Sequence, residues 1–335
     1  MSTKARYAGI AVLTVALAAA VTTVMGGAAA DQDAAGVSDA VLHRFKIDCH
    51  VHQSWTDEGI QKTLDAYRKY NTMACAFGTL ATLDRAKEHP DVFIPFGTLR
   101  LSDPNALQLI DQYHAAGFKG VGELMAAGRD YDDPVFDPIW ARLQQYHMVA
   151  VLHTGIVNRR SGRGGRGRRG GAAGAGRAAR AAAPPNQPEG SSWLNMHPGF
   201  LDVIARRYPT LILIGAHLGN PWYAEAAEGA RWSPNLYFDI SGSSLIKKAS
   251  HPEYWGDVFW WRPDIATGKH SPGGTYGFEK LVFASDEAPD QLLPNIQRFE
   301  RMLDANNVPE TVRANMWAGT VAKILGVQEH AAPAH

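Results

Sequence analysis

Residues 45–53 read Phe-Lys-Ile-Asp-Cys-His-Val-His-Gln, an apolar run that ends in two histidines. Alternate side chains of a strand share a face, so His50 and His52 are expected to point the same way. An open doubly wound sheet usually carries a glycine-rich phosphate turn after its first strand, and this chain has histidines there instead. The run therefore predicts a strand over 45–52 in a parallel fold of another kind.

Seven further apolar runs predict strands, and stretches with helical spacing lie between them. The strands are expected over residues 72–79, 92–100, 118–124, 148–154, 211–218, 236–241 and 281–285. Eight strands that alternate with helices predict an α/β protein with the fold of a (β/α)8 TIM barrel. An open doubly wound sheet is the alternative.

The helix predictions rest on apolar spacing and on capping residues. One helix is expected over 57–70, with an apolar face made by Ile60, Leu64 and Tyr67. A second is expected from Asp103-Pro104, an N-cap followed by proline at the first helical position. This second helix is expected to bury Leu107, Ile110 and Ala115. Further helices are expected to begin near Pro134, His197 and Asp290.

Two segments fall outside this alternation. Residues 1–30 are predicted to be a signal peptide, because two basic residues, Lys4 and Arg6, precede an apolar run and Ala28-Ala29-Ala30 resembles a cleavage site. An uncleaved membrane anchor is the alternative. Residues 158–190 contain eight Arg, nine Gly and eight Ala, and they are predicted to be a disordered insert within a domain that covers residues 41–328.

The composition is that of a globular protein, with 45% apolar and 20% charged residues. The formal net charge is zero, but the insert and the amino-terminal segment hold ten of the basic residues and one acidic residue. The rest of the chain has 23 basic and 32 acidic residues, a net charge of −9, so no specific nucleic-acid partner is expected. The two cysteines, Cys49 and Cys75, are expected to be buried thiols rather than one disulfide.

Histidines and carboxylates recur at the ends of the predicted strands. Barrels of this kind carry their catalytic groups at those ends. Imidazole and carboxylate suit Zn²⁺ and similar divalent ions. Each residue also has a simpler interpretation. A His-x-His pair is frequent by chance, and a histidine after an apolar strand, such as His153 or His217, is commonly structural. Asp286 suits a helix N-cap, and Glu123 suits a cap or an ion pair with arginine. The other histidines, such as His89, His114, His251, His330 and His335, are expected at the surface. The strand-end residues are His50, His52, Glu123, His153, His217, Asp239 and Asp286.

The combined motifs resemble the amidohydrolase superfamily. The nearer match is the amidohydrolase-related family that includes aminocarboxymuconate-semialdehyde decarboxylase, and it spans about residues 45–326. The matching stretches are Ile47-Asp-Cys-His-Val-His52, Val151-Leu-His-Thr-Gly155, Ile214-Gly-Ala-His-Leu-Gly219 with Pro221-Trp222, Asn235-Leu-Tyr-Phe-Asp-Ile-Ser-Gly242, Phe283-Ala-Ser-Asp286 and the helix at Pro198–Pro209. Two features depart from the family pattern. Ala284 stands where the family often has glycine, and the insert follows His153 closely.

The resemblance implies roles for these residues. It implies that His217 is a base or electrophile behind the metal ligands, and that Glu123 bridges two ions in members that hold two. It implies one or two divalent ions, with zinc expected and manganese the alternative. The implied metal ligands are His50, His52, His153 and Asp286, joined by Glu123 where two ions bind.

We therefore expect an exported, metal-dependent hydrolase of a small organic amide, ester or lactone. Metal-activated water would attack the carbonyl, Asp286 would take the proton and His217 would stabilise the oxyanion. The alternatives are a decarboxylase of a small aromatic or unsaturated acid, a hydratase or lactonase, and a non-catalytic binding protein on the same barrel. The expected partner is a small-molecule substrate. No membrane partner is expected beyond the export signal, and a homodimer is left open.

The long connection from Gly242 to Lys280 is rich in aromatic residues. It is expected either to cover the site as a lid or to pack a helix against the barrel. Its aromatic rings and one arginine would suit a ring or acyl substrate that bears a carboxylate. The residues in question are Tyr254, Trp255, Trp260, Trp261 and Arg262.

Overall fold

The computed structural model describes residues 37–156, 193–259 and 277–328. It divides into two units, residues 1–42 and residues 43–335, and the barrel belongs to the second. Several predictions lie outside the described residues: the signal peptide at 1–30, the insert at 158–190, the lid residues Trp260–Arg262, and His330 and His335. Among the residues that are described, no helix is long and apolar enough to cross a membrane.

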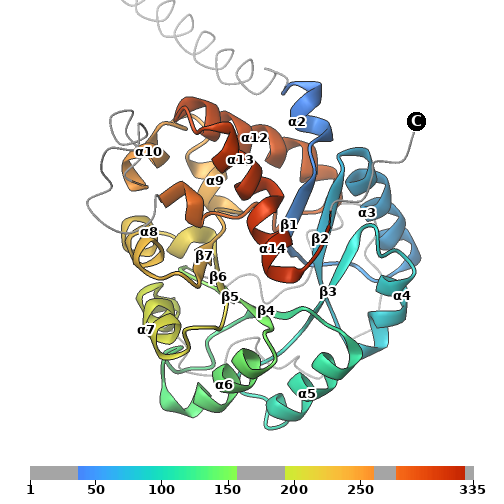
Figure 1. Cartoon of the computed structure of the whole chain (residues 1–335), viewed down its shortest axis with the longest axis vertical. Helices are drawn as coiled ribbons and strands as arrows, with labels where there is room; N and C mark the ends of the chain where they lie inside the picture. Colours follow the sequence, from blue (N-terminus) through green and yellow to red (C-terminus); the bar gives the residue numbers. More distant parts are fainter. Residues whose placement is uncertain (1–36, 157–192, 260–276, 329–335) are drawn as a thin grey trace, which may run out of the picture. The chain divides into compact units, whose positions relative to one another are not determined.

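Seven parallel strands form the sheet, in the same order in space as in the sequence (Figure 1). Parallel neighbours in sequence order, each joined by a helix, are the arrangement of a TIM barrel, so the predicted fold class is confirmed. The strands are β1 (Lys46–Val51), β2 (Thr72–Gly78), β3 (Phe93–Gly97), β4 (Gly120–Leu124), β5 (Val149–His153), β6 (Leu213–Ala216) and β7 (Leu236–Phe238).

The eighth predicted strand, over 281–285, does not form a regular ladder, and that prediction is wrong in detail. Only one isolated bridge joins Leu281 to Phe238 in β7. The segment still bonds to both neighbours, because Val282 N donates to Phe238 O at 3.0 Å and Cys49 N donates to Phe283 O at 3.0 Å. Residues 281–286 therefore take the eighth place between β7 and β1.

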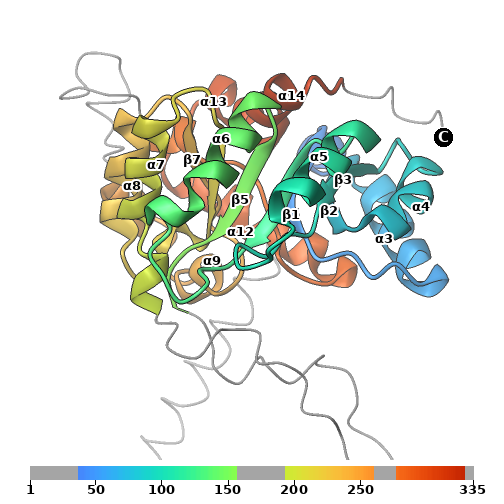
Figure 2. The ribbon, with the colours of Figure 1, turned by 90° about the horizontal axis from the view of Figure 1, so that it is seen from below.

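Helices surround the strands (Figures 1 and 2). The predicted helix over 57–70 is α3 (Asp57–Lys69), which begins where the Thr56 side chain accepts from Gly59 N and buries Ile60, Leu64 and Tyr67. The other helices of the described residues are α2 (Asp39–His43), α4 (Leu83–Lys87), α5 (Ala106–Ala116), α6 (Asp137–Gln145), α7 (Gly199–Arg207), α8 (Tyr223–Trp232), α9 (Ser243–Lys247), α10 (Tyr254–Val258), α12 (Leu292–Ala305), α13 (Glu310–Ala314) and α14 (Thr320–Leu325).

The helix predicted from Asp103-Pro104 begins later, at Ala106 in α5, with Asn105 as its N-cap. The Asp103 carboxylate accepts from Asn105 N at 2.8 Å and so belongs to the turn before the helix. The later start also changes the buried face. Ile110 is buried as predicted, but Leu107 is half-buried and Ala115 is exposed, and the buried positions are Ala106, Ile110 and Tyr113.

The three other helix starts lie close to their predicted positions. Short 3-10 turns at Pro134–Phe136 and Pro289–Gln291 lead into α6 and α12. Helix α7 begins two residues after His197, whose Nδ1 accepts from Gly199 N at 3.1 Å.

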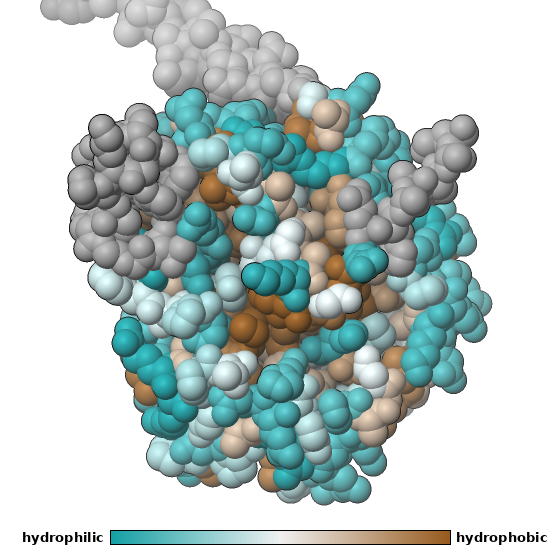
Figure 3. Space-filling view, viewed as in Figure 1, coloured by the Kyte–Doolittle hydropathy of each residue, from teal (hydrophilic) through white to brown (hydrophobic). Residues whose placement is uncertain are grey.

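Apolar side chains fill the barrel and continue into the carboxyl-terminal segment. Helix α14 lies across the centre of the ring in Figure 1, and apolar residues gather near the centre of that face in Figure 3. Ala318 in the turn before α14, and Val321 and Leu325 of α14, belong to this core, and both elements contact β1. The mouth of the barrel is the end at which the carboxyl ends of the strands lie. The core cluster is Ile47, Cys49, Met73, Cys75, Phe77, Ile94, Phe96, Val149, Val151, Ile214, Val282, Ala284, Ala318, Val321 and Leu325.

Two smaller predictions are settled by this packing. Cys49 and Cys75 are both free and buried, as expected, and burial raises the pKa of the Cys49 thiol. Trp255 in α10 is fully buried, with its ring 5.2 Å from that of Tyr223 and 6.2 Å from that of Phe259. The packing interpretation therefore holds for Trp255.

Candidate metal centre

An extra residue in β1 turns both histidines toward the mouth. In the pairing with β2, Asp48 lies opposite Ala74 and Val51 lies opposite Ala76. A step of three residues along β1 thus matches a step of two along β2, a register shift of one residue. Ile47 and Cys49 face the core before this shift, and the His50 ring lies 5.5 Å from the Phe77 ring after it. The Nε2 atoms of His50 and His52 are 3.2 Å apart.

Asp48, which precedes the shift, points away from the mouth. Its Oδ2 accepts from the Tyr67 hydroxyl of α3 at 2.8 Å, and its Oδ1 accepts from His50 N at 3.1 Å and Ser285 N at 3.0 Å. Burial raises the pKa of Asp48 above its ordinary value despite these donors. Asp48 thus anchors β1 to α3 and to the eighth segment without entering the cluster.

Glu123 at the end of β4 lies between two pairs of histidines. Its Oε2 is 3.4 Å from His52 Nε2 and 3.7 Å from His50 Nε2. Its Oε1 is 2.6 Å from His153 Nδ1 and 3.4 Å from His217 Nε2. Burial alone would raise the pKa of Glu123, but the charges of His153 and His50 and the hydrogen bonds from His153 and His217 hold it well below the usual value.

A second register shift lies between Val121 and Leu124 and includes Glu123. Val121 pairs with Ala150 but Leu124 with Leu152, again three residues against two. A Cβ at Gly122 would lie 2.7 Å from the Cβ of Val151, closer than real Cβ contacts. Glycine therefore lets β4 approach β5 directly before the residue that carries the carboxylate.

Asp286 and His217 complete the cluster, and the main chain of each has a positive φ. Asp286 has φ 51° and His217 has φ 64°. Asp286 Oδ1 lies 3.5 Å from the Nε2 atoms of both His50 and His52. The N-cap interpretation of Asp286 is wrong, because the following 3-10 turn is capped by Ala288. Non-glycine residues in this strained conformation gather at functional sites.

Asp239 after β7 holds two of these histidines in place. Its Oδ2 accepts from His50 Nδ1 at 3.3 Å, and its Oδ1 accepts from His217 N at 2.9 Å and from the Ser241 hydroxyl at 2.6 Å. Burial would raise the pKa of Asp239, but the hydrogen bond and charge of His50 lower it. Carboxylates that bind the outer nitrogen of a ligand histidine are common at metal sites. The sequence predicts Asp239 at the mouth but predicts no role for it.

The hydrogen bonds of the outer ring nitrogens set the tautomers. His217 Nδ1 faces two acceptors, Ser241 O at 3.3 Å and Ser241 Oγ at 3.1 Å, and that hydroxyl donates to Asp239. His50 Nδ1 faces the Asp239 carboxylate. A ring that binds a cation through Nε2 would therefore keep its proton on Nδ1, whereas the hydrogen bond from His217 Nε2 to Glu123 belongs to the protonated ring.

The residues fit a divalent cation. Three groups of residues each have ligand atoms within 4.8 Å of one another. Two sets share Glu123, and the third consists of His50, His217 and Asp239. His153 Nε2 is buried and has no hydrogen-bond partner in the described part of the chain, so a ligand would satisfy it. Against the effect of burial, Asp286 and Glu123 raise the pKa of His50 and Glu123 raises that of His217, so the cluster stabilises positive charge. The two sets are His50, His52 and Glu123, and Glu123, His153 and His217.

All six predicted site residues thus meet at one place, and two of the histidines expected at the surface, His114 and His251, are indeed exposed.

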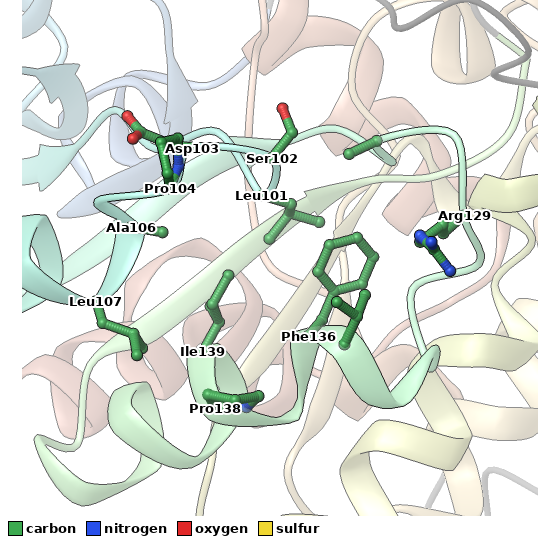
Figure 4. A pocket seen from close by; sticks show the side chains of 12 residues that line it. Leu101, Ser102, Asp103, Pro104, Ala106, Leu107, Arg129, Phe136, Pro138 and Ile139 are labelled. Atoms are coloured by element: carbon green, nitrogen blue, oxygen red, sulfur yellow. The ribbon is translucent and has the colours of Figure 1, made fainter.

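A separate cavity of about 340 Å³ lies between the loops after β3 and β4 and the starts of α5 and α6 (Figure 4). Leu101, Phe136 and Ile139 line it and Arg129 lies at its edge, whereas none of the six site residues does.

Fold and cluster together define a TIM-barrel protein with a candidate metal centre at the mouth. The model of the amidohydrolase family matches residues 66–327, so the chain belongs to that family of enzymes, and the predicted resemblance is confirmed. The match begins after His50 and His52. The comparison with curated proteins gives no match.

Solved structures of low sequence identity share the fold. An uncharacterized TIM-barrel protein of Bordetella bronchiseptica is 14% identical, with a TM-score of 0.54 over 84% of this chain and 98% of that chain. A probable 2-pyrone-4,6-dicarboxylic acid hydrolase of Acinetobacter baumannii, with citric acid bound, is 11% identical, with a TM-score of 0.52 over 84% and 99%. A 5-carboxyvanillate decarboxylase of Novosphingobium aromaticivorans, complexed with manganese and a nitrobenzoic acid, is 13% identical, with a TM-score of 0.50 over 87% and 98%.

Proposed function

We propose that this protein is a metal-dependent hydrolase that acts on the carbonyl of a small amide, ester or lactone. The observation that carries the proposal is the position of Glu123. One carboxylate oxygen faces His50 and His52 and the other faces His153 and His217. A carboxylate shared by two histidine pairs suits two ions, and two-metal sites are frequent in hydrolytic enzymes.

The proposed ligands divide into two groups around Glu123. His50, His52 and Asp286 would hold one ion, and His153 and His217 the other. Zinc is the proposed ion because four imidazoles favour it, with manganese as the alternative. Bound ions would polarise the carbonyl and lower the pKa of water toward neutrality.

The protein's own groups would move the proton. Asp286 is placed to accept it, because its side chain is 25% exposed, the largest access to solvent among the three carboxylates of the cluster. Its Oδ2 lies 3.9 Å from His217 Nε2, on the side away from His50 and His52. His217 as an electrophile would need a proton on Nε2, and its two acceptors at Nδ1 favour the ligand role instead.

Decarboxylation is the second candidate, because the similar structures include a decarboxylase as well as a hydrolase. A single ion held by His50, His52 and Asp286 would suffice to orient a carboxylated substrate. That reaction would make Glu123 a structural partner of the histidines rather than a bridge.

Glu123→Gln separates the two candidates. The amide keeps the size of the side chain but removes the charge that two ions would share, so we expect loss of hydrolysis by at least about 100-fold. The measurement is turnover on a panel of amides, esters, lactones and aromatic acids, with carbon dioxide release followed in parallel. Glu253→Gln, at a surface glutamate, is the matched control. Carbon dioxide release that survives Glu123→Gln, without hydrolysis in either protein, would move the assignment to the decarboxylase.

A further inference from the structure

The hydroxyl of Tyr131 lies between the ends of the two strands that carry Glu123 and His153. It is 2.9 Å from Leu124 O, the carbonyl directly after Glu123, and 2.8 Å from His153 O. The side chain is completely buried. A single hydroxyl proton shared between two carbonyls joins the main chain of both residues at one point.

This link falls where the regular pairing of β4 and β5 stops. The last pair of the register is Leu124 with Leu152, one residue before His153. On the other side of β5, Thr154 Oγ1 donates to Ala216 O of β6 and accepts from Gly219 N at 2.8 Å. Side-chain hydrogen bonds therefore join the end of β5 to both neighbouring strands beyond the last backbone pairs. Thr154 makes this link to β6, and Tyr131 makes it to β4.

Tyr131 is itself fixed by its neighbours. The indole Nε1 of Trp140 in α6 donates to Tyr131 O at 3.1 Å. The adjacent Asp130 accepts from Asn195 Nδ2 at 2.6 Å. The main chain that carries the Tyr131 ring is therefore held by side chains of two other elements.

We infer that Tyr131 is a positioning residue for the metal centre, which sets the spacing of Glu123 and His153 through their main chains. The contact that it would govern is the 2.6 Å pair between Glu123 Oε1 and His153 Nδ1. Both ions would share Glu123, but only the second ion would take two ligands, Glu123 and His153, from the strands that Tyr131 joins. The first ion would keep His50, His52 and Asp286, none of which Tyr131 contacts. The inference rests on the proposed two-metal function.

Tyr131→Phe tests it, with Tyr113→Phe as the matched control. Tyr113 is also buried, and its hydroxyl donates to a main-chain carbonyl, Thr98 O at 2.8 Å, directly after β3, where no candidate ligand lies. Both variants lose one oxygen atom and keep the ring. The measurement is Zn²⁺ affinity by competition with a chromogenic chelator, together with a thermal melt of each protein.

The expected result is selective weakening of one ion. Tyr131→Phe should bind its second Zn²⁺ about 10-fold more weakly and its first with a smaller change, since lost supporting contacts weaken metal binding by roughly 10–100-fold. Tyr113→Phe should keep both affinities while losing similar thermal stability. Equal affinities in the two variants, or a Tyr131→Phe protein that unfolds while Tyr113→Phe folds, would overturn the inference and leave the proposed function standing. Wild-type protein that binds no Zn²⁺ would instead overturn the proposed function itself.

Discussion

Lys46 is a charged residue at the start of β1 that the fold buries. Its Nζ donates to Arg44 O at 2.7 Å and Tyr70 O at 2.9 Å and lies 5.8 Å from the Trp317 ring. Burial and the neighbouring Arg44 charge lower the pKa of Lys46 to about 7, against a smaller opposite effect of Glu300. The residue lies at the closed end of the barrel, so it bears on stability rather than on the mouth.

The lowered pKa makes a pH-dependent stability prediction. Between about pH 7 and the ordinary pKa of lysine, Lys46 is protonated in the unfolded chain but largely neutral in the folded protein. The free energy of unfolding should therefore rise with pH in that window. The rise due to this group is at most about 1.4 kcal/mol per pH unit. Lys46→Met removes the titration, and urea unfolding of both proteins from pH 7 to 10 measures the difference. Parallel curves for the two proteins would contradict the lowered pKa.

The strands and helices show how far the sequence can predict this fold. Helix α3 follows from the Thr56 cap and a regular apolar face, both of which are local. Helix α5 begins two residues later than predicted, because the Asp103 carboxylate accepts from Asn105 N in a turn before the helix. An Asp-Pro pair suits such a turn as well as a helix start. The apolar run over residues 281–285 predicts a strand, but the sequence does not show that this segment bonds alternately to β7 and β1.

The candidate site was predicted more completely than its supports. Strand ends of a barrel converge, so the order of the motifs was enough to bring His50, Glu123, His153, His217 and Asp286 together. The extra residues in β1 and β4 arise from pairing with β2 and β5, and that pairing cannot be deduced from one strand alone. The roles of Asp239 and Tyr131 likewise depend on contacts between distant elements, which carry no local sequence signal.

The whole protein is proposed to act outside the cytoplasm. The basic start, the apolar run and the small residues before Asp31 in residues 1–30 support export. Outside residues 1–30 and the arginine-rich segment at 158–190, the chain has a net negative charge. Expression of the full chain with amino-terminal sequencing of the exported form tests this. We expect a mature protein that begins near Asp31. Protein that stays in the cytoplasm with Met1 or Ser2 at its start would contradict export, and exported protein that remains membrane-bound would favour the uncleaved anchor.

The number of divalent ions per chain tests the central claim most directly. Protein purified without chelators, and then supplied with Zn²⁺ and freed of excess, should hold two ions per chain by elemental analysis. Removal of the ions should abolish turnover, and returning Zn²⁺ or Mn²⁺ should restore it. A chain that takes up no ion, or one whose single ion is retained unchanged in Glu123→Gln, would contradict a hydrolase built around a shared Glu123.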